Sequence, residues 1–96
     1  MIISWTEAAE SDLYHATEFI AKNSVQAAVA VAQRIYDAVE FLADFPEMGR
    51  PGRWPNSREL VVSDLPFVIP YRGDGAEILI LGIIHTSRSW PDDDAH

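Results

Sequence analysis

A segment rich in proline and glycine divides the chain into two halves with different hydrophobic patterns. Residues 46–57 contain three prolines and two glycines, so neither a continuous helix nor a central strand persists through them. Before this segment, apolar residues recur every three to four positions, which is typical of helices; after it, strand-forming residues dominate in short runs. The chain is therefore predicted to be an α+β domain, with helices first and most strands afterwards.

The first half predicts two helices. Thr6 is a suitable N-cap for a helix that runs to about Lys22, and Ser24 is suitable for a second helix that ends at Phe45-Pro46. Each helix carries one apolar stripe: Ala9, Leu13, Ala16 and Ile20 on the first, and Ala28, Ala32, Ile35, Val39 and Leu42 on the second. Because the break between the helices is short, we expect a helical hairpin.

Four runs have the composition of strands. Residues 2–5 precede the helices, and residues 58–63, 67–72 and 76–84 follow the loop. The Gly73-Asp74-Gly75 sequence between the last two runs is typical of a hairpin turn. The predicted order is β-α-α-β-β-β, a small antiparallel sheet packed on an N-terminal helical hairpin, with residues 1–96 forming a single domain.

A register for the last hairpin follows if Asp74-Gly75 is a two-residue turn, because Arg72 then lies opposite Glu77 as a favourable charge pair. One face of the sheet is then almost wholly apolar and is expected to pack on the helices: Phe67, Ile69, Tyr71, Ile78, Ile80 and Ile84. The second face comprises Val68, Pro70, Arg72, Glu77, Leu79, Leu81, Ile83 and His85. That face is too apolar to be left bare, so we expect a partner to cover it. A one-residue slip would exchange the two faces.

The net charge of −8 is unevenly distributed. Residues 1–49 carry eight acidic and two basic side chains. The other five basic residues are all arginines in the second half: Arg50, Arg53, Arg58, Arg72 and Arg88. The overall acidity argues against general affinity for nucleic acid, whereas the local arginines permit a small anionic site.

Composition also limits the kind of site and the location. The chain has no cysteine and only three scattered histidines, so neither a disulfide framework nor a structural zinc site is expected, and no metal or cofactor is predicted. The sequence opens without a basic segment of the kind that precedes a signal peptide, and its longest apolar run, residues 78–84, is too short to span a membrane. We expect a cytoplasmic protein.

The order of several short motifs resembles the RelE/ParE superfamily of toxins. These motifs are Trp5, Ala8-Ala9, Asp12-Leu13, Phe19-Ile20, Phe45-Pro46 with Gly49-Arg50, Arg58-Glu59-Leu60, Pro66, Tyr71 and Ile78-Leu79-Ile80-Leu81, together with His85 and Arg88. No single motif is specific, but their order and spacing extend over nearly the whole chain. The resemblance implies a type II toxin that a cognate antitoxin holds inactive, with operator DNA contacted only through the antitoxin.

The resemblance also implies one of two activities. In ribosome-dependent mRNA cleavage, His85 with Arg58 and Arg88 would transfer protons and stabilise the phosphate charge. In poisoning of DNA gyrase, the toxin traps a cleaved-DNA intermediate and need not be an enzyme. The nuclease branch is usually strongly basic, whereas this chain has a pI near 4.6, and its Gly-Arg loop and Leu-Gly-Ile-Ile-His segment look more like the gyrase-directed branch. Gyrase poisoning is the favoured hypothesis; mRNA cleavage and a decayed toxin that only binds antitoxin stay open.

Family antitoxins typically lay a helix and an extended segment over their toxin, which fits the partly apolar second face. The candidate antitoxin-binding residues are Arg50, Arg53, Val68, Arg72, Leu79, Leu81 and Ile83. Structural alternatives exist for the other candidates: a strand-end hydrogen bond to backbone for His85, a salt bridge for Arg58, and core packing for Tyr71, which we do not predict to be catalytic.

Overall fold

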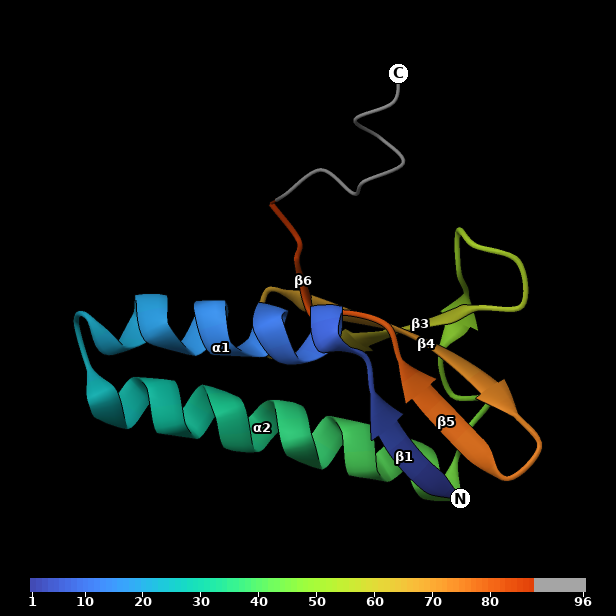
Figure 1. Ribbon diagram of the computed structural model, residues 1–96. Coiled ribbons are helices and arrows are strands. Elements are labelled where there is room, and N and C mark those ends of the chain that lie inside the picture. Colours follow the sequence, from blue (N-terminus) through green and yellow to red (C-terminus); the bar gives the residue numbers. More distant parts are fainter. Residues whose placement is uncertain (88–96) are drawn as a thin grey trace.

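The computed structural model describes residues 1–87, and Figure 1 shows a helical hairpin beside a twisted sheet. The elements are β1 (Ile2–Trp5), α1 (Glu7–Ala21), α2 (Val25–Asp44), β2 (Arg50–Pro51), β3 (Arg58–Val62), β4 (Phe67–Asp74), β5 (Glu77–Ile80) and β6 (Ile84–His85). The predicted order of helices and strands is confirmed, with a short extra strand, β2, inside the loop. No helix within residues 1–87 has the length and apolar character needed to cross a membrane.

Both helices begin where their capping residues predict. The Thr6 hydroxyl accepts a hydrogen bond from the Ala9 N–H at 3.0 Å, and the Ser24 hydroxyl accepts one from the Ala27 N–H at 3.0 Å. Each bond satisfies an N–H that the first helical turn leaves without a partner. α2 ends at Asp44, with Phe45 as its C-cap, because the next residue, Pro46, disfavours a helical conformation at Phe45.

The sheet is mixed rather than purely antiparallel. Its strand order is β1-β5-β4-β3-β2, with β6 paired to β4. β4 runs antiparallel to β3, β5 and β6, whereas β1 runs parallel to β5. The prediction of an antiparallel sheet was therefore wrong for this edge. The chain between β1 and β5 passes through both helices and three strands, so no hairpin turn imposes an antiparallel arrangement.

The hairpin between β4 and β5 turns one residue later than predicted. Asp74 lies opposite Glu77, so Gly75-Ala76 form the turn, and Gly75 has a φ of 64°. A positive φ at the first turn position favours glycine and suits a two-residue hairpin. Arg72 consequently lies opposite Leu79 and not Glu77. Because the pairing shifts by an even number of residues, the faces of β4 and β5 remain as predicted.

A bulge between β5 and β6 reverses the alternation of the chain after Ile80. Ile80 lies opposite Tyr71, and Ile84 lies opposite Val68. Between these pairs the chain has three residues, 81–83, where β4 has only two, 69 and 70. One extra residue in one strand exchanges the two faces beyond that point.

Because of this bulge, the predicted faces of three residues were wrong. Ile83, expected on the second face, is 4% exposed and belongs to the hydrophobic core. His85 lies opposite the core residue Phe67, on the helical side, and Ile84 lies opposite Val68 on the second face. Asp12 of α1 stabilises the bulge, because its Oδ2 accepts a hydrogen bond from the Ile83 N–H at 3.0 Å.

The core lies between the first face of the sheet and the helices. Among its fully buried side chains are Tyr71, Ile35, Leu42, Ile69, Ile78 and Ile80. Burial of each aliphatic side chain contributes about 1.5–3 kcal/mol. The helices pack on the first face of the sheet, and most of the predicted antitoxin-binding residues lie on the second face or in the loop beside it.

Candidate functional site

A buried carboxylate organises the loop between β2 and β3. Glu59 is 6% exposed. Its Oε1 accepts hydrogen bonds from Nε and Nη2 of Arg50 at 3.3 and 3.2 Å, and its Oε2 accepts one from the backbone N–H of Arg53 at 3.3 Å. Nε of Arg53 lies 3.9 Å from Oε2. Because an unpaired buried charge is strongly unfavourable, these contacts hold the loop between β2 and β3 against β3.

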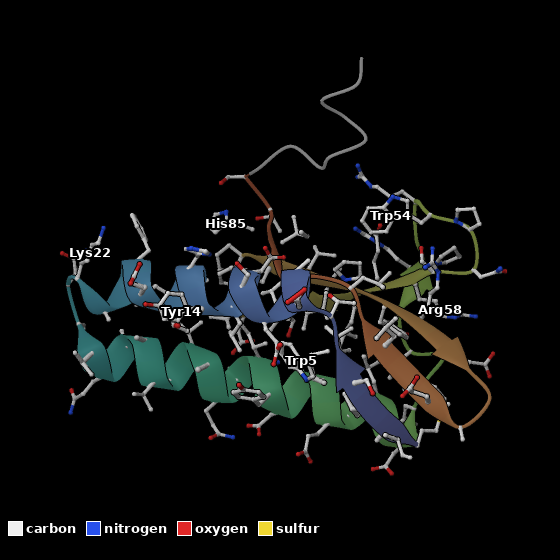
Figure 2. The ribbon with its side chains drawn as sticks, in the orientation of Figure 1. Trp5, Tyr14, Lys22, Trp54, Arg58 and His85 are labelled. Carbon is white, nitrogen blue, oxygen red and sulfur yellow. The ribbon has the colours of Figure 1, made fainter. Side chains whose placement is uncertain are left out.

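The same loop is attached to β4 from its other end. Nε of Arg72 donates a hydrogen bond to the carbonyl of Pro55 at 3.2 Å. Within the loop, the Gly52 N–H donates to the Ser57 carbonyl at 2.8 Å, and the Ser57 hydroxyl donates to the Trp54 carbonyl at 2.6 Å. Figure 2 shows Trp54 on this loop, on the same side of the molecule as Arg58.

Tyr71 holds the segment that leads from α2 into this loop. Its hydroxyl donates to the Pro46 carbonyl at 2.8 Å and accepts from the Gly49 N–H at 2.8 Å. Burial raises the pKa of the Tyr71 phenol above its ordinary value, although the Gly49 hydrogen bond and the Arg58 charge lower it. A Cβ at position 49 would lie 2.7 Å from the Tyr71 ring, so this approach requires glycine. The prediction that Tyr71 packs in the core is confirmed.

Arg58 is engaged in the same segment. Its Nη1 donates to the carbonyls of Gly49 at 2.8 Å and Glu47 at 3.3 Å, and its Nη2 lies 3.8 Å from the Glu47 carboxylate. The side chain is 38% exposed. Arg58 thus holds the loop closed through two backbone carbonyls, and its ion pair is with Glu47 in the loop rather than with the acidic helices.

His85 lies far from Arg58. Arg58 pairs with Tyr71 on one side of β4, and His85 pairs with Phe67 on the other side. From ordinary strand rise and spacing, the Cα atoms of Arg58 and His85 are about 17 Å apart. Figure 2 shows the two side chains in separate parts of the molecule. The structure does not bring these two members of the predicted acid–base set together, and the third, Arg88, lies outside the described residues.

The surroundings of His85 are those of a strand end. Its ring packs edge-on against Phe67 with the centroids 5.3 Å apart. Its Nδ1 accepts a hydrogen bond from the Ser87 N–H at 3.1 Å and lies 2.7 Å from the Ser87 hydroxyl. Within residues 1–87, no three histidine, aspartate or glutamate side chains gather closely enough to hold a metal ion.

The predicted antitoxin-binding residues do not all remain accessible. Val68 is 6% exposed and Ile83 is in the core, whereas Leu79, Leu81 and Arg72 are half-buried. The Arg50 side chain is 60% exposed despite its pairing with Glu59. The accessible part of the second face is therefore a small apolar area bordered by arginines. Sequence reasoning missed Glu59, whose role depends on loop contacts that no periodicity reveals.

Comparison with known proteins decides the family. The family model described as the ParE toxin of the type II toxin-antitoxin system, parDE, matches residues 3–90. The chain belongs to the ParE toxin family. The resemblance inferred from the motif order is confirmed, and membership makes this protein the toxin component of a type II system with an antitoxin as its partner.

Relatives of this ParE-family toxin match it over nearly its whole length. Y4kP of Sinorhizobium fredii is 42% identical over 89 residues, covering 93% of this chain and 92% of that protein. Toxin RelE2 of Caulobacter vibrioides is 36% identical over 86 residues, covering 90% and 96% respectively. A chain in the structure of the chromosomal ParDE TA system from P. aeruginosa superimposes with a TM-score of 0.79 at 31% identity, covering 88% of this chain and 95% of that chain.

Proposed function

We propose that the free toxin inhibits growth by poisoning DNA gyrase, using surface contacts rather than acid–base chemistry of its own. The observation that carries this proposal is the strand pairing, which places Arg58 opposite Tyr71 on one side of β4 and His85 opposite Phe67 on the other; ordinary strand geometry then separates their Cα atoms by about 17 Å. Metal-free RNA cleavage needs proton transfer and charge stabilisation around one phosphate, and the Arg58 guanidinium is already bonded to the Gly49 and Glu47 carbonyls. The match to the ParE family model supports the same branch.

The direct biochemical test uses purified toxin, gyrase and supercoiled plasmid. Plasmid cleaved in the presence of gyrase should accumulate with increasing toxin, and the His85→Ala variant should act at the same concentration, because His85 takes no part in the chemistry. Reactions without gyrase serve as the control. A toxin that leaves gyrase turnover and plasmid cleavage unchanged would contradict the proposal.

The same proposal assigns the antitoxin to the second face of the sheet. The antitoxin would place apolar side chains on Leu79 and Leu81, and acidic side chains beside Arg50, Arg53 and Arg72, because opposite charges favour the association. Ile83 is not part of this surface, since it lies in the core.

Charge reversal tests the antitoxin surface. Arg72→Glu should weaken the complex with the cognate antitoxin at least about tenfold, which corresponds to about 1.4 kcal/mol. Lys22→Glu, at the end of α1, should leave the affinity unchanged and is the matched control. Equal affinities of both variants in titration calorimetry would exclude this face.

A further inference from the structure

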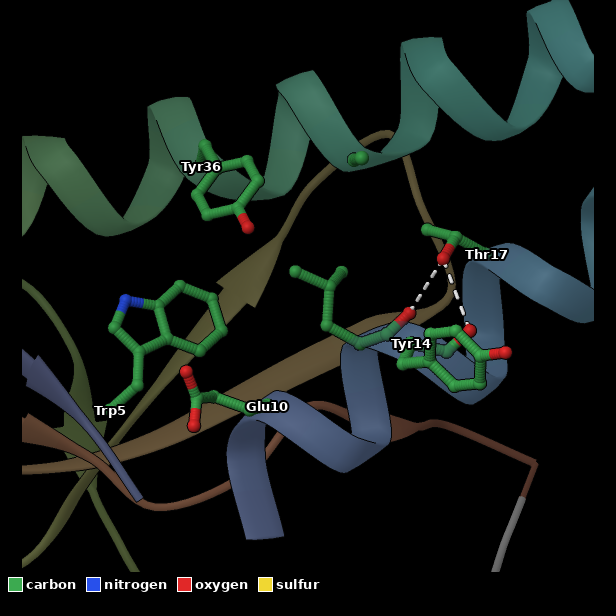
Figure 3. A pocket seen from close by; sticks show the side chains of 7 residues that line it. Trp5, Glu10, Tyr14, Thr17 and Tyr36 are labelled. Carbon is green, nitrogen blue, oxygen red and sulfur yellow. Dashed lines mark hydrogen bonds between the residues drawn. The ribbon is translucent and has the colours of Figure 1, made fainter. Parts of the chain in front are cut away.

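A groove on the helical side of the molecule has no role in the site described above. One part of it, about 430 Å³ in volume, is lined by Trp5, Glu10, Tyr14 and Tyr36 among others, as Figure 3 shows. An adjoining part of about 290 Å³ also contains Trp5 and Tyr36, together with Glu40. Both parts lie between α1, α2 and β1 and have Trp5 and Tyr36 in their lining; together we call them the aromatic groove.

Two of the three aromatic side chains of this groove are exposed, and Trp5 is half-buried. The rings of Trp5 and Tyr36 lie 5.5 Å apart between centroids, tilted by 52°. Tyr36 is 47% exposed and Tyr14 is 61% exposed. Exposed faces of tryptophan and tyrosine attract both apolar groups and cations, and a guanidinium can stack on them.

A carboxylate without a partner lies beside the aromatic pair. Figure 3 shows the Glu10 carboxylate extending toward the ring of Trp5. Within residues 1–87, the side-chain carboxylates of Glu10 and Glu40 have neither a hydrogen bond nor an ion pair, although the Glu10 backbone N–H donates to the Thr6 carbonyl. By contrast, Glu18 accepts a hydrogen bond from Tyr14 at 2.9 Å, and Asp37 accepts one from Gln33 at 2.9 Å.

The charges around the groove favour a cationic occupant. Residues 1–49 carry eight acidic side chains and two basic ones. Nε of Arg34 is paired with Asp64 at 3.0 Å. Lys22 lies over the ring of Phe19, at the end of α1. The lining around Glu10 contains no lysine, arginine or histidine.

We propose that the aromatic groove binds a segment of a partner protein in which an arginine stands among apolar residues. The guanidinium stacks on Trp5 and Tyr36 and pairs with the Glu10 carboxylate, while the apolar neighbours fill the remaining length of the groove. This segment has the opposite charge to the one assigned to the second face, so the two surfaces receive different segments. The proposal does not depend on gyrase as the target.

A second copy of this chain fits the groove less well. Each copy has a net charge of −8, so pairing two acidic helical faces is unfavourable. Two of the exposed arginines that a copy offers, Arg50 and Arg58, already contact Glu59 and Glu47. A basic segment from another protein meets neither obstacle.

The test uses the full chain and two short amphipathic peptides that are identical except at one position, arginine in one and neutral citrulline in the other. Binding is followed by titration calorimetry and by the nuclear magnetic resonance signal of the Trp5 indole N–H. At low salt the arginine peptide should bind about tenfold more tightly than the citrulline peptide, since only arginine can form both a cation–π contact and an ion pair in the groove.

Three variants test whether the preference for the arginine peptide arises in the aromatic groove. Glu10→Gln should abolish the preference for arginine, and Tyr36→Leu, which keeps an apolar wall, should reduce it. Glu7→Gln is the matched control, because Glu7 is exposed in the same helical turn and does not line the groove. Equal binding of the two peptides, no binding of either, or a preference that survives Glu10→Gln would overturn the proposal. So would a dimer in sedimentation whose formation shifts the Trp5 signal, because a second copy would then fill the groove.

Discussion

Tyr71, Glu59 and Asp12 each stabilise backbone that neither helix nor sheet can satisfy. The Tyr71 hydroxyl bonds Gly49 and Pro46, the Glu59 carboxylate accepts from the Arg53 N–H, and Asp12 accepts from the Ile83 N–H. Backbone groups in loops and bulges have no ladder partner, so side chains take that role. These residues hold the shape of the loop and of the bulge.

Tyr71→Phe should lower the free energy of unfolding by about 1–3 kcal/mol at pH 7, because it leaves the buried Gly49 N–H without an acceptor. The pH dependence of the stability difference shows whether the Tyr71 hydroxyl, rather than the change in ring packing, is responsible. Burial raises the pKa of the folded-state phenol above its ordinary value of 10.0, so its stabilisation is complete below that pH and is lost as the pH rises above it. The stability difference between wild type and variant, measured by urea unfolding, should therefore narrow above pH 10. A difference that is constant or grows would contradict this account.

Asp12→Ala should destabilise the fold by about 1–3 kcal/mol, because the Ile83 N–H in the bulge loses its acceptor. Asp12→Asn keeps an oxygen there and should recover most of the loss. The exposed neighbour Ser11 provides the control, and Ser11→Ala should change the unfolding midpoint little. If Asp12→Asn were as unstable as Asp12→Ala, the hydrogen bond would not be the cause.

At the scale of elements, local chemistry made the helices predictable. Thr6 and Ser24 both cap as expected, and the Pro/Gly-rich segment is a loop. The strands were predicted in order, but not their details. Glycines at 73 and 75 permit more than one turn. Gly82 lies in the bulge and is the one sequence signal for it, but it does not say how many extra residues the strand contains. Such features depend on tertiary contacts, including the one from Asp12.

The candidate site was predictable only in part, for the same reason. Arginine clustering was visible in the composition, but the pairing of Arg50 and Arg53 with Glu59 depends on how the loop folds onto β3. The proximity of His85 and Arg88 in the sequence suggested one site with Arg58. The pairing of strands places Arg58 and His85 on opposite sides of β4.

The closed conformation of the loop between β2 and β3 should depend on Glu59. Glu59→Gln weakens the contacts to Arg50 and Arg53, so the loop should open more often and trypsin should cleave after Arg53 about tenfold faster. The bond after Arg50 resists trypsin because proline follows it. Glu47→Gln is the control, since the Glu47 side chain is 87% exposed and its pair with Arg58 contributes little. Unchanged cleavage of the Glu59→Gln variant would show that the loop is held by other contacts.

At the scale of the whole molecule, the two sides have opposite chemistry. The helical side is acidic and carries the aromatic groove, whereas the loop and the second face of the sheet carry the arginines. A molecule with two such surfaces is suited to binding partners of different charge. We expect activity to arise from these surfaces, because the predicted acid–base set is not assembled within the described residues.

Gyrase poisoning is tested most directly by inducible expression in cells, with and without the cognate antitoxin, for wild type and His85→Ala at matched protein levels. Induction of the SOS response and the integrity of mRNA are scored in the same cultures. Gyrase poisoning predicts SOS induction, intact mRNA, full toxicity of the variant, and protection by the antitoxin. Cleaved mRNA with an inactive variant would contradict it and establish a nuclease, and no toxicity in the absence of antitoxin would contradict it and identify a decayed toxin.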